Sequence, residues 1–296
     1  MTVMNTAKSP PPTINRAQLK MSDEAAWYAR LSEETVNGIP DTDKPQHALI
    51  GQIVFNRPAN RNSLTPEMLK ALQAAIADAK KDTDIRCLII TGTGKNFCAG
   101  GDFKGGAENS AIPFTQQGLI DTYSTCMELL NISVPVIGAL NGHAIGGGFG
   151  VALLSDIRVA NNDALYGANF ARLGMHSGMS LSYILPRLIG LAKANELMFT
   201  GRRFSGCEGE RIGLFNYALP TEQVWPKALE LAVEIAACAP NAVQLMKQSI
   251  INNLDWDPHS RLAKEALHQS ASFNSNDARE GIAAMMEKRE PVFKGT

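Results

Sequence analysis

The 296-residue sequence lacks an excess of charge of either sign. Its 28 Lys and Arg residues are balanced by 29 Asp and Glu residues, which gives a formal net charge of −1. A basic surface for nucleic acid and a long acidic tail are therefore both absent, and nucleic acid is not an expected partner. Hydrophobic residues make up 45% of the chain. That share can bury a large core, so the composition excludes general disorder.

Closely spaced cysteines are also lacking. The five cysteines, Cys87, Cys98, Cys126, Cys207 and Cys238, are odd in number and widely separated. Because no pair has C-x-x-C spacing, the pattern indicates neither a zinc site nor a disulfide framework, and we expect no metal. A reducing, cytoplasmic compartment is the simpler interpretation.

An apolar signal segment is missing as well, because the first 20 residues have no apolar core. Residues 129–155 contain no Asp, Glu, Lys or Arg and are long enough to span a bilayer. However, Asn131, Pro135, Asn141 and His143 interrupt them, together with three consecutive glycines. Since these residues disfavour one continuous helix, a buried strand, a turn and a buried helix are predicted, and no membrane is expected as a partner.

The apolar periodicity predicts an α/β fold. Strands are expected at 47–56, 87–92, 135–140, 156–160 and 164–166, and helices at 66–79, 114–130 and 149–155. Thr65-Pro66-Glu67 combines a capping hydroxyl, a proline at the first helical position and an acid, which is typical of a helix start. Trp27 and Tyr28 are expected on a short helix within residues 16–36. After residue 193 the chain is predicted to be mostly helical.

Three regions are expected along the chain. Residues 1–46 form an N-terminal extension, partly disordered because three consecutive prolines and polar neighbours precede the periodic part, with a linker at 37–46. Residues 47–230 form the core. Residues 231–296 form a helical region, with helices beginning near 241, 258 and 276 after one that covers 221–239.

Glycine is the most informative residue type. Twelve of the 25 glycines fall in two clusters, at 92–106 and 138–150, which are flanked by apolar runs. The pattern suits tight turns beside buried strands, where backbone N–H groups can face a ligand. The first cluster is not a phosphate loop, because Ile89 and Asn96 occupy positions that the motif reserves for Gly and for Ser or Thr. The patterns G-x-G-x-x-G and G-x-S-x-G are also absent.

Five segments together resemble the crotonase (enoyl-CoA hydratase/isomerase) superfamily. They are FNRPANRNSLTPEML at 55–69, FCAGGDFKGG at 97–106, PVIGALNGHAIGGGFGVALLSDIRVA at 135–160, ANELMFTGRRFSGCEGERIGL at 194–214 and SNDAREGIAAMMEKREPVFKG at 275–295. They occur in order and with ordinary spacing over residues 47–296. The resemblance implies a crotonase-like spiral of ββα units, with a C-terminal helical region for trimerisation. It also implies assembly as a homotrimer or homohexamer.

The resemblance further implies chemistry on an acyl-CoA thioester. Members of the family stabilise a thioester enolate with two converging backbone N–H groups, which by family register are those of Gly101 and Gly147. Glycine permits the close approach of the backbone, and the N-terminus of the following helix adds partial positive charge. Coenzyme A enters as part of the substrate, and no separate cofactor is expected.

Contacts with coenzyme A are implied at three places. One is the backbone that includes Asp102, Phe103 and Lys104, and another is Arg57 near the first strand. The third is Lys288, whose Glu-Lys-Arg context matches the C-terminal helix of the family, where this lysine often reaches the ligand of a neighbouring subunit. An ordinary surface cation is the alternative for each basic residue.

Both glutamates of the family's hydratases are missing from this sequence. By family register the first position holds Gly150 and the second holds Phe170. Neither residue can move a proton, so the usual addition of water, which needs a base at hydrogen-bond distance, is in doubt. His176 is the leading substitute, because histidine titrates near neutrality and other branches place a catalytic aspartate in this loop. A packed or exposed loop histidine is the alternative.

Four further polar residues are weaker candidates for acid/base work. His143 precedes the oxyanion helix and is expected to pack as part of the turn. Tyr183 follows the His176 loop at helical spacing, with a core aromatic as the alternative. Asp121 and Glu128 lie on the 114–130 helix, which borders the acyl pocket in the family, and a solvated helix face is favoured for them.

Three functions remain open from the sequence. The first is an enzyme that stabilises the enolate of an acyl-CoA with a non-glutamate acid/base and performs isomerisation, altered hydration or thioester chemistry. The second is a carbon–carbon hydrolase that cleaves a β-diketone or a ring β-ketoacyl-CoA by a retro-Claisen reaction. The third is a non-catalytic relative that binds a ligand or a partner.

Overall fold

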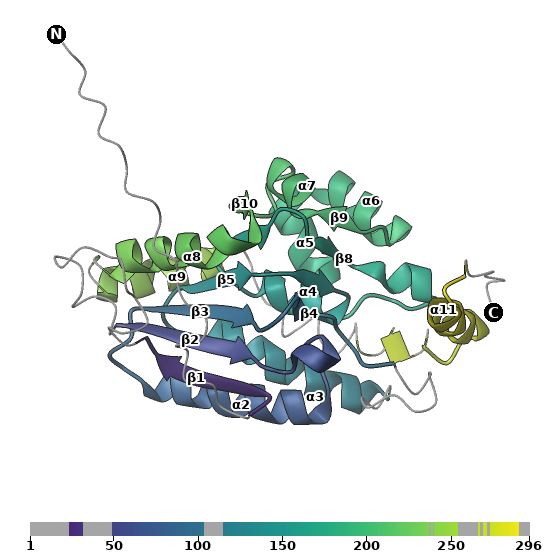
Figure 1. Ribbon diagram of the computed structural model, residues 1–296, viewed down its shortest axis with the longest axis horizontal. Coiled ribbons are helices and arrows are strands. Elements are labelled where there is room, and N and C mark those ends of the chain that lie inside the picture. The colour runs from purple at the N-terminus through teal and green to yellow at the C-terminus, as the bar shows by residue number, and fades with distance from the viewer. Residues whose placement is uncertain are drawn as a thin grey trace, which may run out of the picture.

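Two β-sheets organise the chain, as Figure 1 shows. The computed structural model describes residues 24–31, 49–103, 115–236, 238, 240–253, 266, 269–270 and 273–289. The disordered segment expected at 1–15, the linker at 37–46, Lys104 and the start of the helix near 258 lie outside these residues. The rest confirms the prediction of an α/β fold.

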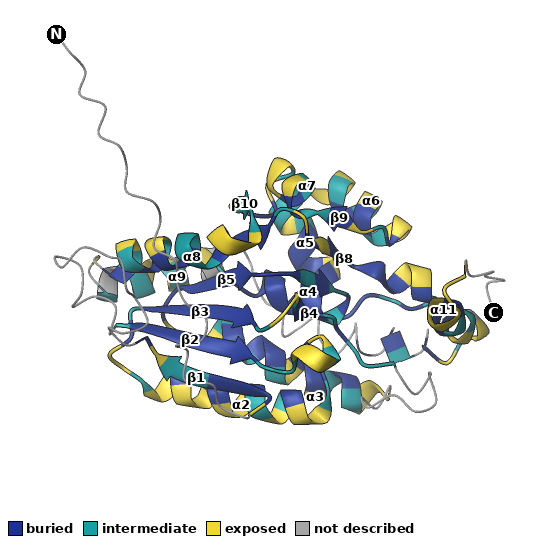
Figure 2. Ribbon diagram, in the orientation of Figure 1, coloured by how far each residue is buried: buried dark blue, intermediate teal, exposed yellow. Residues whose placement is uncertain are grey.

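The larger sheet has six strands in the order β1-β2-β3-β5-β7-β10. Its members are β1 Ala26–Arg30, β2 Ile50–Phe55, β3 Cys87–Gly92, β5 Val136–Leu140, β7 Ile157–Asn161 and β10 Tyr217–Leu219. β1 is antiparallel to β2, and the other neighbours pair in parallel. Strands β2, β3 and β5 are buried along their whole length (Figure 2), which explains why their sequences are mostly apolar.

The smaller sheet has the order β4-β6-β8-β9. Its members are β4 Asn96–Cys98, β6 His143–Ile145, β8 Leu165–Gly167 and β9 Phe204–Ser205. From β3 to β8 successive strands alternate between the two sheets, so each ββα unit supplies one strand to each. This is the predicted crotonase-like spiral. Among the strands of two or three residues only β8 was predicted, whereas β4, β6, β9 and β10 were not, because so short a segment seldom carries a periodic pattern.

Helices cover both faces of the larger sheet. Leu88 and Ile90 of β3 share a core with the apolar side of α2 Pro66–Lys81, whereas Ile89 faces the opposite core with α8 Thr221–Ala236. The predicted start of α2 is confirmed, because Thr65 Oγ1 accepts a hydrogen bond from the Met68 N–H at 3.2 Å. Alternate residues of one strand therefore anchor two helical layers.

The prediction of a helix that carries Trp27 and Tyr28 is wrong. Both residues lie on β1, where Trp27 pairs with Val54 and Tyr28 pairs with Ile53 of β2. The edge of the sheet supplies the hydrogen bonds of this segment, and aromatic side chains suit the half-buried surface of a strand. A contact between segments far apart in the sequence therefore overrides the local pattern.

Further helices, all shorter than α2 and α8, complete the described structure. They are η4 Pro58–Asn60, α3 Gln116–Met127, η5 Glu128–Asn131, α4 Gly147–Leu153, η6 Asn169–Leu173, α5 Leu181–Ile189, α6 Leu191–Thr200, α7 Gly206–Arg211, α9 Pro240–Asn253 and α11 Asn276–Glu287. Strands β5 and β6 and helix α4 account for most of the uncharged stretch at 129–155, which confirms a strand, a turn and a helix there. No helix in the described residues is long and apolar enough to cross a membrane.

Candidate active site

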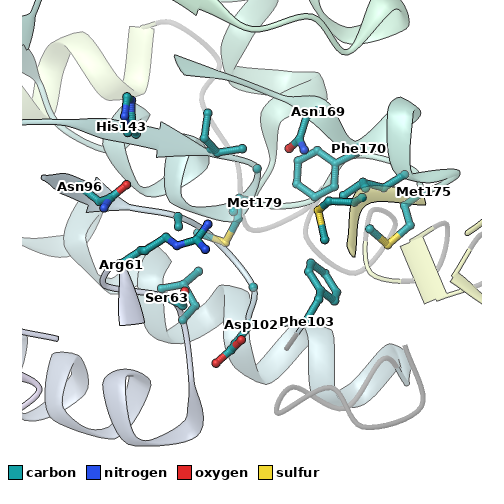
Figure 3. A pocket seen from close by; sticks show the side chains of 18 of the residues that line it. Arg61, Ser63, Asn96, Asp102, Phe103, His143, Asn169, Phe170, Met175 and Met179 are labelled. Carbon is teal, nitrogen blue, oxygen red and sulfur yellow. The ribbon is translucent and has the colours of Figure 1, made fainter. Parts of the chain in front are cut away.

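A cavity of about 310 Å³ is lined by residues of both glycine clusters. Figure 3 shows Asn96 and His143 on one side of the view, Phe103, Phe170 and Met175 on the other, and Met179 between them. In this view the labelled polar side chains lie mainly on one side of the cavity and the labelled apolar ones mainly on the other, with Asn169 beside Phe170. The polar or charged lining residues are Asn60, Arg61, Ser63, Asn96, Asp102, Thr122, Tyr123, His143, Asn169, Arg203 and Gln269.

The two glycine turns meet at the wall of this cavity. Gly101 and Gly147 both line it. A Cβ atom on Gly100 would lie 2.6 Å from the Ile145 carbonyl oxygen and 3.1 Å from the Gly147 nitrogen, so the two backbones touch. Gly100 also has a φ of +82°, a conformation that favours glycine. The structure thus brings together the two residues whose N–H groups the sequence singled out.

Helix α4 begins at this turn. Gly147 is its first residue, so the unsatisfied N–H groups and the partial positive charge of the helix N-terminus lie at the cavity wall. Gly148 packs on the end of β4, since a Cβ there would lie 2.0 Å from the Cys98 carbonyl oxygen. Burial raises the pKa of the Cys98 thiol to about 12, so this cysteine stays protonated and is not a nucleophile.

Apolar groups stand at both positions that the sequence analysis assigned to the hydratase glutamates. A Cβ on Gly150 would lie 2.3 Å from Met179 Cβ and 2.9 Å from Met179 Cγ, so the methionine fills the space beside the glycine. Met179 and Phe170 both line the cavity. Among the described residues that line it, Asp102 is the only carboxylate, and Asn60 Nδ2 donates to Asp102 Oδ2 at 3.0 Å. No pair of carboxylates is available there to activate water.

His176 and Tyr183 are not among the described residues that line the cavity. His176 is half-buried, and its Nδ1 lies 2.7 Å from the Ser177 carbonyl oxygen, while the preceding Met175 reaches the cavity. Tyr183 is buried on α5, with the Arg187 guanidinium 3.4 Å from its ring centroid. A catalytic role for His176 therefore stays a prediction without direct support from the cavity lining.

His143 lines the cavity and is fixed by the backbone of the smaller sheet. The Leu165 N–H donates a hydrogen bond to His143 Nδ1 at 2.8 Å. Burial, and next the positive charge of Arg203, lower the pKa of this imidazole below its ordinary value of 6.5. The ring is therefore neutral at pH 7, with its proton on Nε2 because Nδ1 accepts.

Helix α3 brings Tyr123 to the cavity in place of the two predicted acids. Asp121 and Glu128 are not among the described lining residues, and Glu128 forms an ion pair with Lys80 of α2. Tyr123 is 4% exposed and lies one helical turn from Leu119, which also lines the cavity. The spacing of four between these two residues is the sequence signal that identifies the inner face of this helix.

Two arginines supply positive charge at the cavity. Arg61 and Arg203 are exposed lining residues, and neither forms an ion pair with the described part of the chain. Arg57, the predicted contact, does not line the cavity and is paired with Glu67. Arg61 and Arg203 were not predicted as site residues, because a single exposed arginine is not part of any recognisable sequence pattern.

Helix α11 places the end of the chain beside the same cavity. Met285 and Met286 of this helix line it, together with Phe103 and Asp102 from the first glycine loop. Lys288 follows as the exposed C-cap residue, with a φ of +56°, and is not itself a lining residue. The C-terminal helix therefore covers part of the site of its own chain.

The alternating two-sheet spiral, with paired glycine turns at one cavity, defines the class of protein. Residues 46–296 match the family described as Enoyl-CoA hydratase/isomerase. The chain belongs to this family, and the resemblance to the crotonase superfamily is confirmed.

Known relatives agree with this assignment. YngF of Bacillus subtilis (strain 168) is 38% identical over 259 residues, which cover 86% of this chain and 97% of that protein. The mitochondrial enoyl-CoA hydratase domain-containing protein 2 of Bos taurus is 36% identical, over 83% of this chain and 84% of that protein. The crystal structure of an enoyl-CoA hydratase from Bacillus anthracis is 33% identical, with a TM-score of 0.67, and the match covers 84% of this chain and 96% of that one.

Proposed function

We propose that this protein binds an acyl-CoA thioester and stabilises its enolate with the backbone N–H groups of Gly101 and Gly147. The observation that carries the proposal is the contact of the two glycine turns at one cavity wall, where the N-terminus of α4 also lies. A thioester oxygen bound at this wall would accept hydrogen bonds from N–H groups that are already in place, and these would stabilise the negative charge that develops on it. One such donor typically lowers the barrier by about 3–4 kcal/mol.

The polar side of the cavity suits coenzyme A. Arg61 and Arg203 provide cations for its phosphates, since both are exposed and without an ion pair in the described structure. Lys288 adds a third cation near the entrance, because its neighbours Met285 and Met286 line the cavity. In this arrangement the lysine serves the ligand of its own chain.

The acid/base group of the proposed reaction is not a glutamate. Met179 occupies the space beside Gly150, and Phe170 presents a hydrocarbon ring to the cavity. The proton is then transferred by another group. The candidates are His176, which was proposed from the sequence, and His143, which lines the cavity. Isomerisation or another reaction through an enolate fits this set better than the addition of water by paired carboxylates.

Exchange of α-protons tests enolate formation directly. Butyryl-CoA is incubated with the protein in D₂O, and deuterium uptake at the α carbon is followed by mass spectrometry. We expect uptake well above the buffer rate, because an enolate stabilised by the two N–H groups is reprotonated from solvent. Absence of any acyl-CoA binding at micromolar concentration in a calorimetric titration would contradict the proposal.

A carbon–carbon hydrolase is the second candidate, favoured because the described residues that line the cavity include its two glycine turns but no pair of carboxylates. A retro-Claisen cleavage would hold its carbanion in the same place. Mass-spectrometric screening of β-diketones against thioesters separates the two reactions. Failure to convert any compound in both panels would instead favour a non-catalytic ligand-binding relative.

We also propose that the chain assembles as a homotrimer or homohexamer. Exposed apolar side chains on two helices support this assembly. Leu191 and Phe199 of α6 are 66% and 75% exposed, and Leu245, Met246 and Ile250 of α9 are all more than half exposed. Large apolar groups gathered on one helix often mark a protein interface.

A further inference from the structure

Asn169 is a buried polar side chain at the wall of the cavity. It is the first residue of η6, is 8% exposed, and lines the cavity beside Phe170 (Figure 3). Asn169 was not predicted as a site residue from the sequence, because the family register points to the neighbouring Phe170. The side-chain amide is therefore a functional group that the enolate mechanism does not yet use.

The backbone holds this amide next to the oxyanion turn. Asn169 Oδ1 lies 3.3 Å from the position that a Cβ on Gly146 would take, and Gly146 directly precedes Gly147. The Gly146 N–H donates to the Gly167 carbonyl oxygen at 2.9 Å, which extends the pairing of Ile145 with Gly167 between β6 and β8. Asn169 follows the end of β8 by two residues, so the strand pairing fixes its distance from the turn.

The surroundings give the amide no partner within the described part of the chain. No hydrogen bond joins the Asn169 side chain to any described residue. The lining of the cavity that it joins includes the apolar side chains of Phe170, Leu173, Met175 and Met179. Although the residue is 8% exposed, its amide atoms are not among the described polar atoms that are fully enclosed without a partner, so the amide is open to the cavity. A polar group at a cavity wall can form a hydrogen bond with a ligand that presents a matching atom. An amide in such a wall therefore indicates a ligand with a complementary polar atom.

We propose that Asn169 contacts the substrate and hydrogen-bonds an oxygen on the β carbon of the acyl group. The inference rests on the proposed function, in which the thioester oxygen binds at Gly101 and Gly147. The α carbon must lose a proton to form the enolate, so the β carbon is the nearest position that can carry a permanent oxygen. An amide has both a donor and an acceptor, and it therefore suits β-hydroxy and β-keto acyl-CoA thioesters alike.

Matched ligands test this role in a calorimetric titration. We expect the wild-type protein to bind 3-hydroxybutyryl-CoA and acetoacetyl-CoA about tenfold more tightly than butyryl-CoA. Asn169→Leu should abolish that preference and leave the affinity for butyryl-CoA unchanged. Asn131→Leu, at an exposed position on η5, is the matched control and should keep the preference.

Asn169→Asp separates the two hydrogen-bonding directions. A carboxylate accepts but does not donate, so this variant should retain a preference for the hydroxyl ligand and lose it for the keto ligand. Equal wild-type affinities for the three thioesters, or a preference that survives in Asn169→Leu, would overturn the inference. Failure of all three thioesters to bind the wild-type protein would instead contradict the proposed function itself.

Discussion

At the scale of single residues, the side chain of Met179 determines what the cavity offers. Its backbone has a φ of +56°, and its side chain is 1% exposed against Gly150. The space beside the glycine is thus filled by a bulky apolar side chain. Placing a carboxylate at position 150 requires a change at both residues.

Gly150→Glu should destabilise the protein by about 1–3 kcal/mol, because its Cβ would overlap Met179 Cβ, which has no freedom to rotate away. Chemical denaturation measures the loss. The double variant Gly150→Glu, Met179→Gly should recover most of the stability, since glycine at 179 frees the space and accepts the positive φ. A single variant as stable as the wild type would show that Met179 is not held in place.

His176→Ala tests the acid/base hypothesis made from the sequence. We expect this variant to lose turnover and α-proton exchange while its calorimetric affinity for acyl-CoA stays unchanged. His143→Gln serves as the comparison, because His143 lines the cavity whereas His176 does not. Unchanged turnover in His176→Ala would rule out that role and leave His143 as the histidine to examine.

The pKa of His143 links stability to pH. Burial and Arg203 lower this pKa in the folded protein below 6.5, so the unfolded chain takes up a proton first on acidification. The stabilising contribution of the neutral ring is present above about pH 6.5 and is lost as the pH falls towards the folded pKa. Comparing urea midpoints at pH 8 and pH 5.5 should show a smaller drop for His143→Gln than for the wild type.

At the scale of secondary-structure elements, the contact between the two glycine turns is the part of the site most open to a simple test. Gly100→Ala should strongly reduce α-proton exchange, because the new Cβ would lie 2.6 Å from the Ile145 carbonyl oxygen and push the turns apart. Gly190→Ala is the matched control. Gly190 also has a positive φ, of +75°, but no atom lies within 4 Å of its Cβ position. That variant should lose about 1–2 kcal/mol of stability and keep its exchange rate.

The elements also show what local sequence can and cannot predict. β3, β5 and α2 were predicted closely, because apolar runs and the Thr65 cap are local signals. β1 was not, since its strand conformation depends on pairing with β2.

The site shows the same limit. Gly101 and Gly147, which were singled out by family register, line the cavity, and their role as donors stays a prediction. Arg203 and Asn169 reach the cavity through tertiary packing that no local pattern reports.

At the scale of the whole molecule, the proposed assembly can be tested without reference to the reaction. Phe199→Glu places a charge on the most exposed large apolar side chain among the described residues, at 75% exposure. If α6 lies in an interface, light scattering after size exclusion should show a smaller species than the wild-type oligomer, because burying an unpaired charge is unfavourable. A wild-type protein that elutes as a monomer would contradict the proposal.

The pairing of β4 with β6 has a consequence for how reactions diversify on this framework. Gly101 follows β4 and Gly147 follows β6, and these neighbouring strands pair in parallel at Cys98 and Ala144. The spacing of these two backbone N–H groups is therefore a property of main-chain pairing, whereas the side chains around them can be replaced by mutation without disturbing that pairing. In this chain the two glycine turns lie at the cavity wall, while Met179 and Phe170 line the same cavity with apolar side chains.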